Sequence, residues 1–164
     1  MAHMMFRSAE VSECGHYRYL LTRDWDCGDR VTFVMLNPST ADGTWDDPTI
    51  RRCVGFAQLW GFGGMDVVNL FALRSTDPKE LRDNLGNVGP RNNEFIQESV
   101  LRTQATVAAW GGFDEEALYI RARTRKVQAW LPRGTTCLGL TQGGSPKHPL
   151  FMGKDTPRVI FGLG

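Results

Sequence analysis

Short apolar runs alternate with longer amphipathic segments along most of the chain. Runs at residues 17–22 and 31–36 are rich in β-branched and aromatic side chains, and the polar stretch between them predicts a β-hairpin. Further apolar runs predict strands at residues 65–70, 105–110 and 135–140.

Helical spacing of apolar residues fills the intervals between these strands. The pair Asp47-Pro48 predicts a helix start, because aspartate is a favoured N-cap and proline is tolerated at the first helical position. Asp77-Pro78 predicts a short helix, and Pro90 begins a longer one. Another helix is predicted at about residues 114–131, where acidic residues at the start and basic residues toward the end suit the helix dipole.

Strands separated by helices of this length predict a single three-layer α/β/α domain with a mostly parallel sheet. We place this domain at residues 5–164, because residues 1–4 look like a cloning remnant. Ligands of such domains bind at the carboxyl ends of the strands. Polar residues at those ends are therefore the functional candidates, and apolar strand residues belong to the core.

The composition is that of a folded domain. The chain has 164 residues, of which 41% are hydrophobic and 23% charged, and this excludes a disordered tail, a collagen-like chain and a coiled coil. No apolar run approaches the roughly 18 residues of a membrane span and no signal segment opens the chain, so we expect a cytoplasmic protein without a membrane partner. The sequence has no glycine-rich phosphate-binding motif and no GxSxG motif, and we expect no cofactor.

The four cysteines lie apart and form no CxxC pair. We interpret them as reduced structural thiols, which is the usual state in the cytoplasm. A disulfide or a metal site is the alternative, although the spacing typical of zinc ligands is absent from the sequence.

Charge is balanced overall but not along the chain. The net charge is +1, yet residues 1–120 carry −6 and residues 121–164 carry +7. The total argues against a strong non-specific DNA-binding protein. The basic third is open to two interpretations, a face that binds phosphates or the solvated surface of a helix.

Polar and aromatic residues follow the ends of all four predicted central strands. The carboxyl ends of parallel strands meet at one edge, so we expect these residues to share a pocket. Carboxamides recognise base edges and aromatic rings stack on bases, so the set suits a planar ligand such as a nucleobase. The predicted ligand-binding residues from these ends are Ser39, Asn69, Phe71, Arg74, Trp110 and Gly111, with Asn37 and His148 as catalytic candidates.

Other candidates lie in the segment that leads into the first helix, and each has a structural alternative. Because Asp47 is expected to cap the helix, Asp46 is the freer carboxylate and the third catalytic candidate. Trp45 is a stacking candidate, and Phe71 is another, but either side chain also suits a core position. Arg51 is a phosphate-binding candidate, with a surface salt bridge as the alternative.

Several motifs resemble those of an uncharacterised family found in bacteria and viruses, domain of unknown function 1643. The resemblance begins with LNPSTAD at residues 36–42 and DPTIRRC at residues 47–53. It continues with NLFALR at residues 69–74 and GSPKHPL at residues 144–150, and covers about residues 15–155. This family implies no particular activity.

The order of the strand-end motifs is also similar to that of the uracil-DNA glycosylase superfamily. There a polar residue after the first strand positions a water, an asparagine recognises the base, and Trp-Gly and His-Pro-Ser follow. The corresponding residues here are Asn37-Pro38, Asn69, Trp110-Gly111 and His148-Pro149. Two positions depart from that pattern: Ser39 stands in place of a glycine, and Leu150 in place of a serine.

This second resemblance implies a glycosylase-like fold and hydrolysis of an N-glycosidic bond. Asn37 would orient the water, with Asp46 or Asp42 nearby, and His148 would donate a hydrogen bond to the departing base. The partner would be a free nucleobase, a nucleotide, or a single-stranded or flipped base of a nucleic acid. Two alternatives stay open: a binding module that senses nucleotides or modified bases, and an enzyme that modifies nucleotides. Protein partners stay unknown from the sequence.

Overall fold

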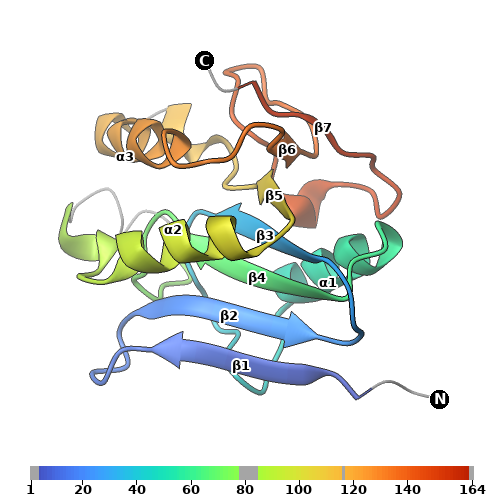
Figure 1. The fold of residues 1–164 in the computed structure, drawn as a ribbon. Helices are drawn as coiled ribbons and strands as arrows, with labels where there is room; N and C mark the ends of the chain where they lie inside the picture. Colours follow the sequence, from blue (N-terminus) through green and yellow to red (C-terminus); the bar gives the residue numbers. More distant parts are fainter. Residues whose placement is uncertain (1–3, 78–84, 116, 163–164) are drawn as a thin grey trace.

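The centre of the fold is a seven-stranded sheet with the order β1-β2-β4-β3-β5-β6-β7, seen in the computed structural model of Figure 1. The structure describes residues 4–77, 85–115 and 117–162. The strands are β1 (Phe6–Val11), β2 (Arg18–Asp24), β3 (Arg30–Met35), β4 (Gly64–Asn69), β5 (Ala105–Ala108), β6 (Thr136–Cys137) and β7 (Val159–Ile160).

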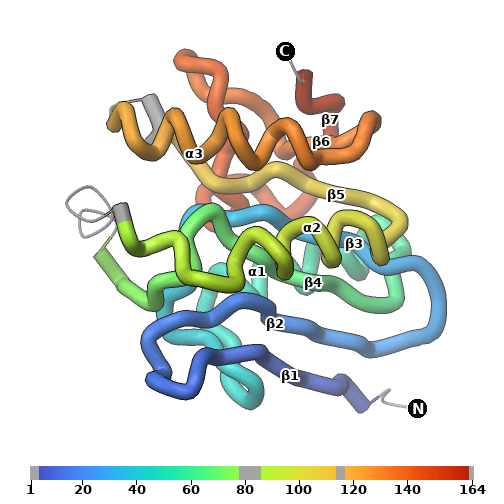
Figure 2. The backbone as a smooth tube through the Cα atoms, turned by 60° about the vertical axis from the view of Figure 1, so that its left-hand side comes forward, coloured from blue at the N-terminus to red at the C-terminus, as the bar shows by residue number. Residues whose placement is uncertain are grey.

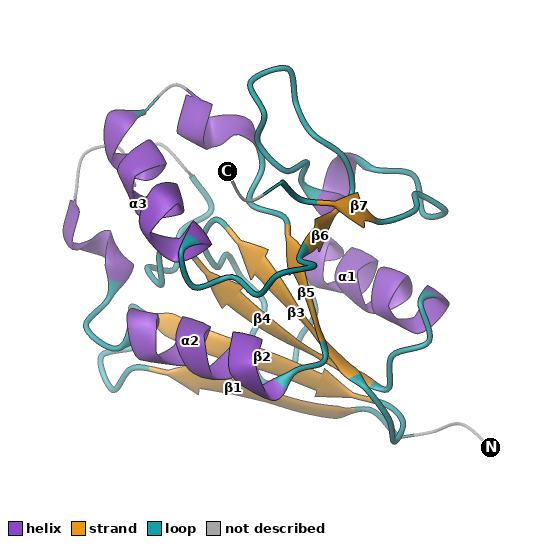
Figure 3. Ribbon diagram, turned by 45° about the horizontal axis from the view of Figure 1, so that its top comes forward, coloured by secondary structure: helices purple, strands orange, loops and turns teal. Residues whose placement is uncertain are grey.

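Helices cover both faces of this sheet and make three layers (Figure 3). The helices are α1 (Pro48–Leu59), α2 (Asn92–Arg102) and α3 (Leu118–Gln128), with short 3-10 turns η2 (Leu85–Val88), η3 (Gly112–Glu115) and η4 (Pro149–Phe151). One apolar core joins α1 to the sheet through residues such as Ile50 and Phe56. A second core joins α2 and α3 to the opposite face through Ile96 and Ile120.

The four strands β4, β3, β5 and β6 are parallel neighbours. Their register aligns Val34 of β3 with Val68 of β4 and with Ala108 of β5, so the carboxyl ends of these strands lie at one edge. The predicted central strands therefore do share a sheet. The sheet as a whole is mixed rather than mostly parallel, because β1, β2 and β7 pair antiparallel. The last predicted strand shortens to two residues before the chain turns at Gly139, where φ is +119°.

The predicted hairpin between β2 and β3 is wrong. The two strands lie in one sheet, but β4 is placed between them and pairs with both (Figure 2). All six residues of β4 are buried, so this strand needs partners on both of its edges. The other edge of β2 pairs with β1, which the apolar pattern did not reveal because five of the six β1 residues are exposed.

Helix α1 begins at Pro48 as predicted, and Asp47 caps it by accepting a hydrogen bond from the Ile50 N–H at 2.9 Å. Helix α3 begins at Leu118 rather than near residue 114. Residues 112–115 form the 3-10 turn η3, so Asp114 precedes the helix instead of lying in its first turn. The short helix expected after Asp77 falls outside the described residues.

All four cysteines are free thiols, two of them exposed and two buried. In the described part of the chain, no cluster of histidine, cysteine, aspartate or glutamate is arranged to hold a metal ion. None of the described helices has the length and apolar character needed to cross a membrane.

Candidate functional site

A cavity of about 660 Å³ opens at the carboxyl edge of the parallel strands. Its walls come from the ends of β3 and β4, the first turn of α1, and the loops that follow β5 and β6. The volume falls within the range of small-molecule sites, about 300–1,000 Å³. The cavity therefore lies where ligands of open α/β sheets bind.

The structure brings many of the predicted site residues to this cavity, although they come from four separate segments of the chain. Met35, Val67 and Ile50 add apolar wall between them. The predicted residues that line the cavity are Asn37, Ser39, Asn69, Trp110, Gly111 and His148.

Asn69 presents an unpaired carboxamide to the cavity. It ends β4, its side chain is 1% exposed, and neither its Oδ1 nor its Nδ2 has a hydrogen-bond partner. Its backbone oxygen accepts a bond from Nδ2 of Asn92 at 2.8 Å, which holds the strand end in place. Trp110 also lines the cavity, and its indole N–H is buried and unpaired as well. Buried polar atoms are costly without partners, so these groups indicate a polar ligand.

Asn37 joins two loops at the side of the cavity. Its Nδ2 donates to the Ser75 backbone oxygen at 2.9 Å and to the Pro38 oxygen at 3.2 Å. This bond to Ser75 connects the segment after β3 to the segment after β4. The amide nitrogen is thus committed to structure, and Oδ1 is the part of the side chain that suits a ligand or a water.

Gly111 connects the end of β5 to the loop that carries His148. Gly111 has a positive φ of +81°, and its N–H donates to the Pro146 oxygen at 2.9 Å. A Cβ at this position would lie 3.6 Å from Cβ of His148 in a backbone conformation that L side chains rarely adopt. The glycine therefore fastens the loop that carries His148 to the cavity wall.

The His148 ring is a hydrogen-bond donor in this site. Its Nδ1 accepts the Leu150 N–H at 3.2 Å, which assigns the proton of the neutral ring to Nε2. Burial lowers the pKa of His148, and the nearby Asp47 carboxylate opposes this only in part. The ring is therefore neutral at pH 7 and offers Nε2–H to a ligand.

We expect this histidine to make the fold weaker in mild acid. The pKa of His148 is lower in the folded state than the roughly 6.5 of the unfolded chain. The unfolded state therefore binds a proton more readily, and stability falls as the pH drops below about 6.5. Thermal midpoints measured between pH 7.5 and 5 should decline less for His148→Gln than for the wild type. An equal decline would show that other groups cause the effect.

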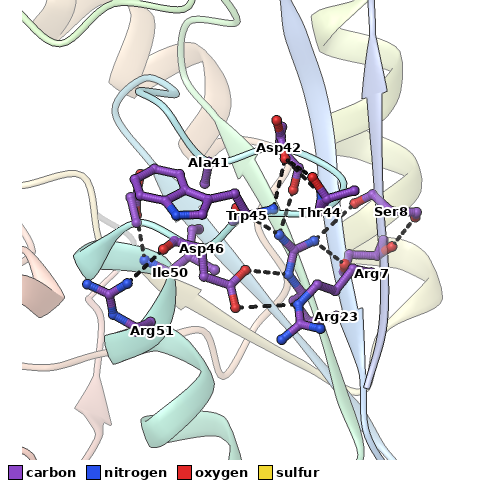
Figure 4. Close-up of polar contacts among 12 residues, drawn as sticks. Arg7, Ser8, Arg23, Ala41, Asp42, Thr44, Trp45, Asp46, Ile50 and Arg51 are labelled. Atoms are coloured by element: carbon purple, nitrogen blue, oxygen red, sulfur yellow. Dashed lines mark hydrogen bonds and ion pairs between the residues drawn. The ribbon is translucent and has the colours of Figure 1, made fainter. Parts of the chain in front are cut away.

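The carboxylate at the cavity is Asp47, not Asp46. Asp47 is 5% exposed and lines the cavity, and its Oδ2 accepts a bond from the Ser39 hydroxyl at 2.8 Å while Oδ1 caps α1. Asp46 instead forms ion pairs with Arg23 at 2.7 Å and Arg7 at 3.7 Å (Figure 4). Asp47 therefore caps α1 and lines the cavity at the same time. From the sequence, a capping role and a site role had been treated as alternatives.

Four further predicted residues lie outside the cavity. Trp45 is half exposed. Arg51 donates to the Asp46 backbone oxygen at 2.8 Å, and both residues are labelled in Figure 4. Phe71 is buried in the core and meets the Tyr119 ring edge-on. Arg74 is half-buried in the loop after β4 and donates its backbone N–H to the His16 oxygen at 2.9 Å.

The cavity also contains polar residues that the sequence reasoning did not select. These residues are Arg18, the first residue of β2, and Lys147, which precedes His148 in the loop after β6. Arg18 was missed because a single arginine in a strand carries no sequence signal of a site. The basic C-terminal third does not form one solvated face, because Arg123 is buried and donates to the Leu70 oxygen at 2.7 Å.

These observations define a mixed α/β domain with a mostly apolar cavity, into which a few polar and aromatic residues are set, at the carboxyl edge of its parallel strands. The chain belongs to the family described as protein of unknown function DUF1643, whose profile matches residues 18–150. That range contains all the strand ends that build the cavity. Comparison with curated proteins and comparison with solved structures give no match.

Proposed function

We propose that the cavity binds a nucleobase, free or as part of a nucleotide, and hydrolyses its N-glycosidic bond. The observation that carries this proposal is the Asn69 carboxamide, which is buried, unpaired at both polar atoms and part of the cavity wall. A carboxamide offers one acceptor and a pair of donors in one plane, which complements the edge of a base. Trp110 lies in the same wall, and its unpaired N–H adds a donor.

The arrangement of the four motifs supports a relation to the uracil-DNA glycosylase superfamily. Asn37 follows β3, Asn69 ends β4, Trp110 follows β5, and His148 follows β6, all beside one cavity. We infer a glycosylase-like fold from this order together with the sequence resemblance.

The proposed reaction uses one water and needs no cofactor. The water oxygen forms a bond to the sugar C1′, and the C1′–N bond breaks with its electron pair passing to the base. Asp47 stabilises the positive charge that develops on the sugar, and Oδ1 of Asn37 orients the water. His148 Nε2–H donates a hydrogen bond to the departing base anion, which takes up a proton from solvent. The proton lost by the water also passes to solvent.

One observation favours a second candidate, a nucleotide sensor without catalysis. Both Asp47 oxygens already accept hydrogen bonds, one from Ile50 N–H and one from the Ser39 hydroxyl. These bonds hold the carboxylate in a structural role and leave it less free to contact a sugar or a water. A sensor would bind a nucleobase-containing ligand and release no base.

The experiment that tests the proposal measures base release. The protein is incubated with nucleosides, 5′-mononucleotides and single-stranded oligonucleotides of each common base, and the free base is measured by chromatography. Release that requires the protein supports the glycosidase. Binding in a thermal-shift assay without release supports the sensor, and neither binding nor release contradicts both.

We expect Asn69→Leu to remove base recognition without loss of stability. The two side chains have similar size, and the substitution replaces two buried unpaired polar atoms with apolar ones. Ligand affinity should fall by at least about 10-fold, because the bonds that recognise the base edge are lost. Calorimetric titration measures the affinity, and the thermal midpoint should stay the same or rise. Unchanged affinity would place the base elsewhere.

A further inference from the structure

We propose that the ligand of this cavity is a free nucleoside monophosphate, with its phosphate near Arg18 and its base near Trp110. This inference rests on the proposed function and names its substrate class. It assigns a phosphate-binding role to Arg18, which the motif comparison did not involve.

Arg18 is a buried cation with too few partners. Its side chain is 2% exposed, it lines the cavity, and its Nε has no hydrogen-bond partner. Its Nη1 donates to the Ala41 oxygen at 2.8 Å. A guanidinium carries five N–H donors, and a buried one is stable only when its charge and its donors are matched. Arg18 therefore lacks an acceptor, preferably an anionic one.

The described residues do not supply that anion at contact distance. Among the residues that the structure describes, no carboxylate forms an ion pair with Arg18, and Asp47 and Asp42 act on it only through space. Burial, together with the positive charges of Arg74 and Arg23, lowers the pKa of Arg18 to about 10, although the negative charges of Asp47 and Asp42 oppose this shift. The side chain is still charged at pH 7, so an anionic ligand relieves the unfavourable burial of this charge.

The cavity as a whole has an excess of positive charge. Within the described ranges of the chain, Arg18 and Lys147 line it, Asp47 is the one carboxylate of the lining, and His148 is neutral at pH 7. The Asp47 carboxylate already accepts hydrogen bonds from the Ser39 hydroxyl and from the Ile50 N–H at the start of α1. A phosphate suits this balance, because arginine binds phosphate oxygens through charge-assisted hydrogen bonds.

The sheet order gives the cavity two different sides. Strands β2 and β4 lie on one side of β3, and they bring Arg18, Ser75 and Thr76 to the cavity. Strands β5 and β6 lie on the other side, and their following loops bring Trp110 and Phe113. Lys147 and Thr141 also line the cavity from the loop after β6, so what distinguishes the β2 side is that its cation, Arg18, is buried. A buried cation there suits a phosphate, and the aromatic rings on the β5 side suit the face of a base, whose edge Asn69 at the end of β4 recognises.

The burial of Arg18 favours a terminal phosphate over the backbone of a nucleic acid. An internal phosphodiester is linked to a nucleotide on each side. It can therefore contact a buried cation only if the cavity leaves room for both neighbouring nucleotides to extend to the solvent. A terminal phosphate has no such requirement. A mononucleotide therefore fits the cavity better than a strand does.

The test compares ligands that differ only in their phosphate. Affinities for the 2′-deoxynucleosides, their 5′-monophosphates and 5′-phosphorylated single-stranded decamers are measured by calorimetric titration at low and at high salt. We expect at least one monophosphate to bind about 10- to 100-fold more tightly than its nucleoside, with the preference smaller at high salt. Arg18→Gln, which keeps a donor for the Ala41 oxygen, should reduce the preference to less than about 3-fold. Arg125→Gln, at an exposed position of α3, is the charge-matched control and should leave it unchanged.

Each outcome separates this inference from the proposed function. Equal affinity for nucleoside and monophosphate overturns the phosphate subsite and leaves base recognition intact. Binding of the decamers alone also overturns it, in favour of a strand substrate. Binding of monophosphates without base release supports the inference and contradicts the glycosidase. If Arg18→Gln does not fold, the comparison of ligands on the wild type decides the question.

Discussion

We expect Asp47→Asn to reduce base release by at least about 100-fold while the protein stays folded. The substitution removes the one carboxylate that the described residues contribute to the cavity wall, and loss of a single group that stabilises transition-state charge commonly costs about 10²–10³ in rate. Asparagine is as good an N-cap as aspartate, so the bond from Ile50 N–H survives and α1 keeps its start. The rate is measured with the best substrate of the panel, and the thermal midpoint is measured in parallel.

The neighbouring residue provides a matched control. Asp46→Asn makes the same chemical change one position earlier, but Asp46 pairs with Arg23 and Arg7 outside the cavity. This variant should lose stability and keep its rate per folded molecule. A result in which Asp46→Asn loses activity and Asp47→Asn does not would reverse our assignment of the carboxylate.

We expect Arg23→Met to destabilise the fold by about 3–5 kcal/mol, the cost of removing one partner from a buried ion pair. Arg23 is completely buried in β2. It donates to Asp46 at 2.7 Å and to the Asp42 backbone oxygen at 2.6 Å (Figure 4). It also donates to the Thr22 backbone oxygen at 2.8 Å. The substitution leaves these acceptors without their donor. For a domain of this size the thermal midpoint should fall by roughly 10 °C.

Arg7→Met tests the same carboxylate from its exposed side. Arg7 is 41% exposed and lies 3.7 Å from Asp46, so its removal should cost less than about 1 kcal/mol. If the two variants lose equal stability, the buried contacts of Arg23 do not hold the 42–46 loop as the structure indicates. If Arg23→Met also loses ligand affinity, this loop positions Asp47 for the site.

The sequence was informative where structure depends on near neighbours. The start of α1 follows from Asp47 and Pro48, whose capping and backbone preferences act within one turn. The central strands followed from continuous apolar runs, since a strand that is buried on both faces needs them. Helix α3 was less predictable, because Asp114 and Glu115, near its expected start, lie in a 3-10 turn instead.

Part of the candidate site could also be predicted from the chain. Polar residues that directly follow apolar strands must lie at a strand end, and parallel strands place their ends together. This reasoning selected Asn37, Asn69, Trp110 and His148, which all line the cavity. It failed for Phe71, because a residue just past a strand end has its side chain on either side of the sheet, and here it packs in the core.

What the sequence by itself determined is the set of local elements and the positions where polar residues interrupt them. The tertiary structure decided which elements are partners: β4 lies between β2 and β3, and the exposed β1 completes the edge. It also decided that Asp47 lines the cavity while Asp46 pairs with Arg23, and that Arg18 is a buried cation beside the ligand site. The physical reason is distance along the chain. Capping and strand formation depend on residues a few positions apart, whereas strand pairing and the surroundings of a charge depend on residues that only the completed fold brings together.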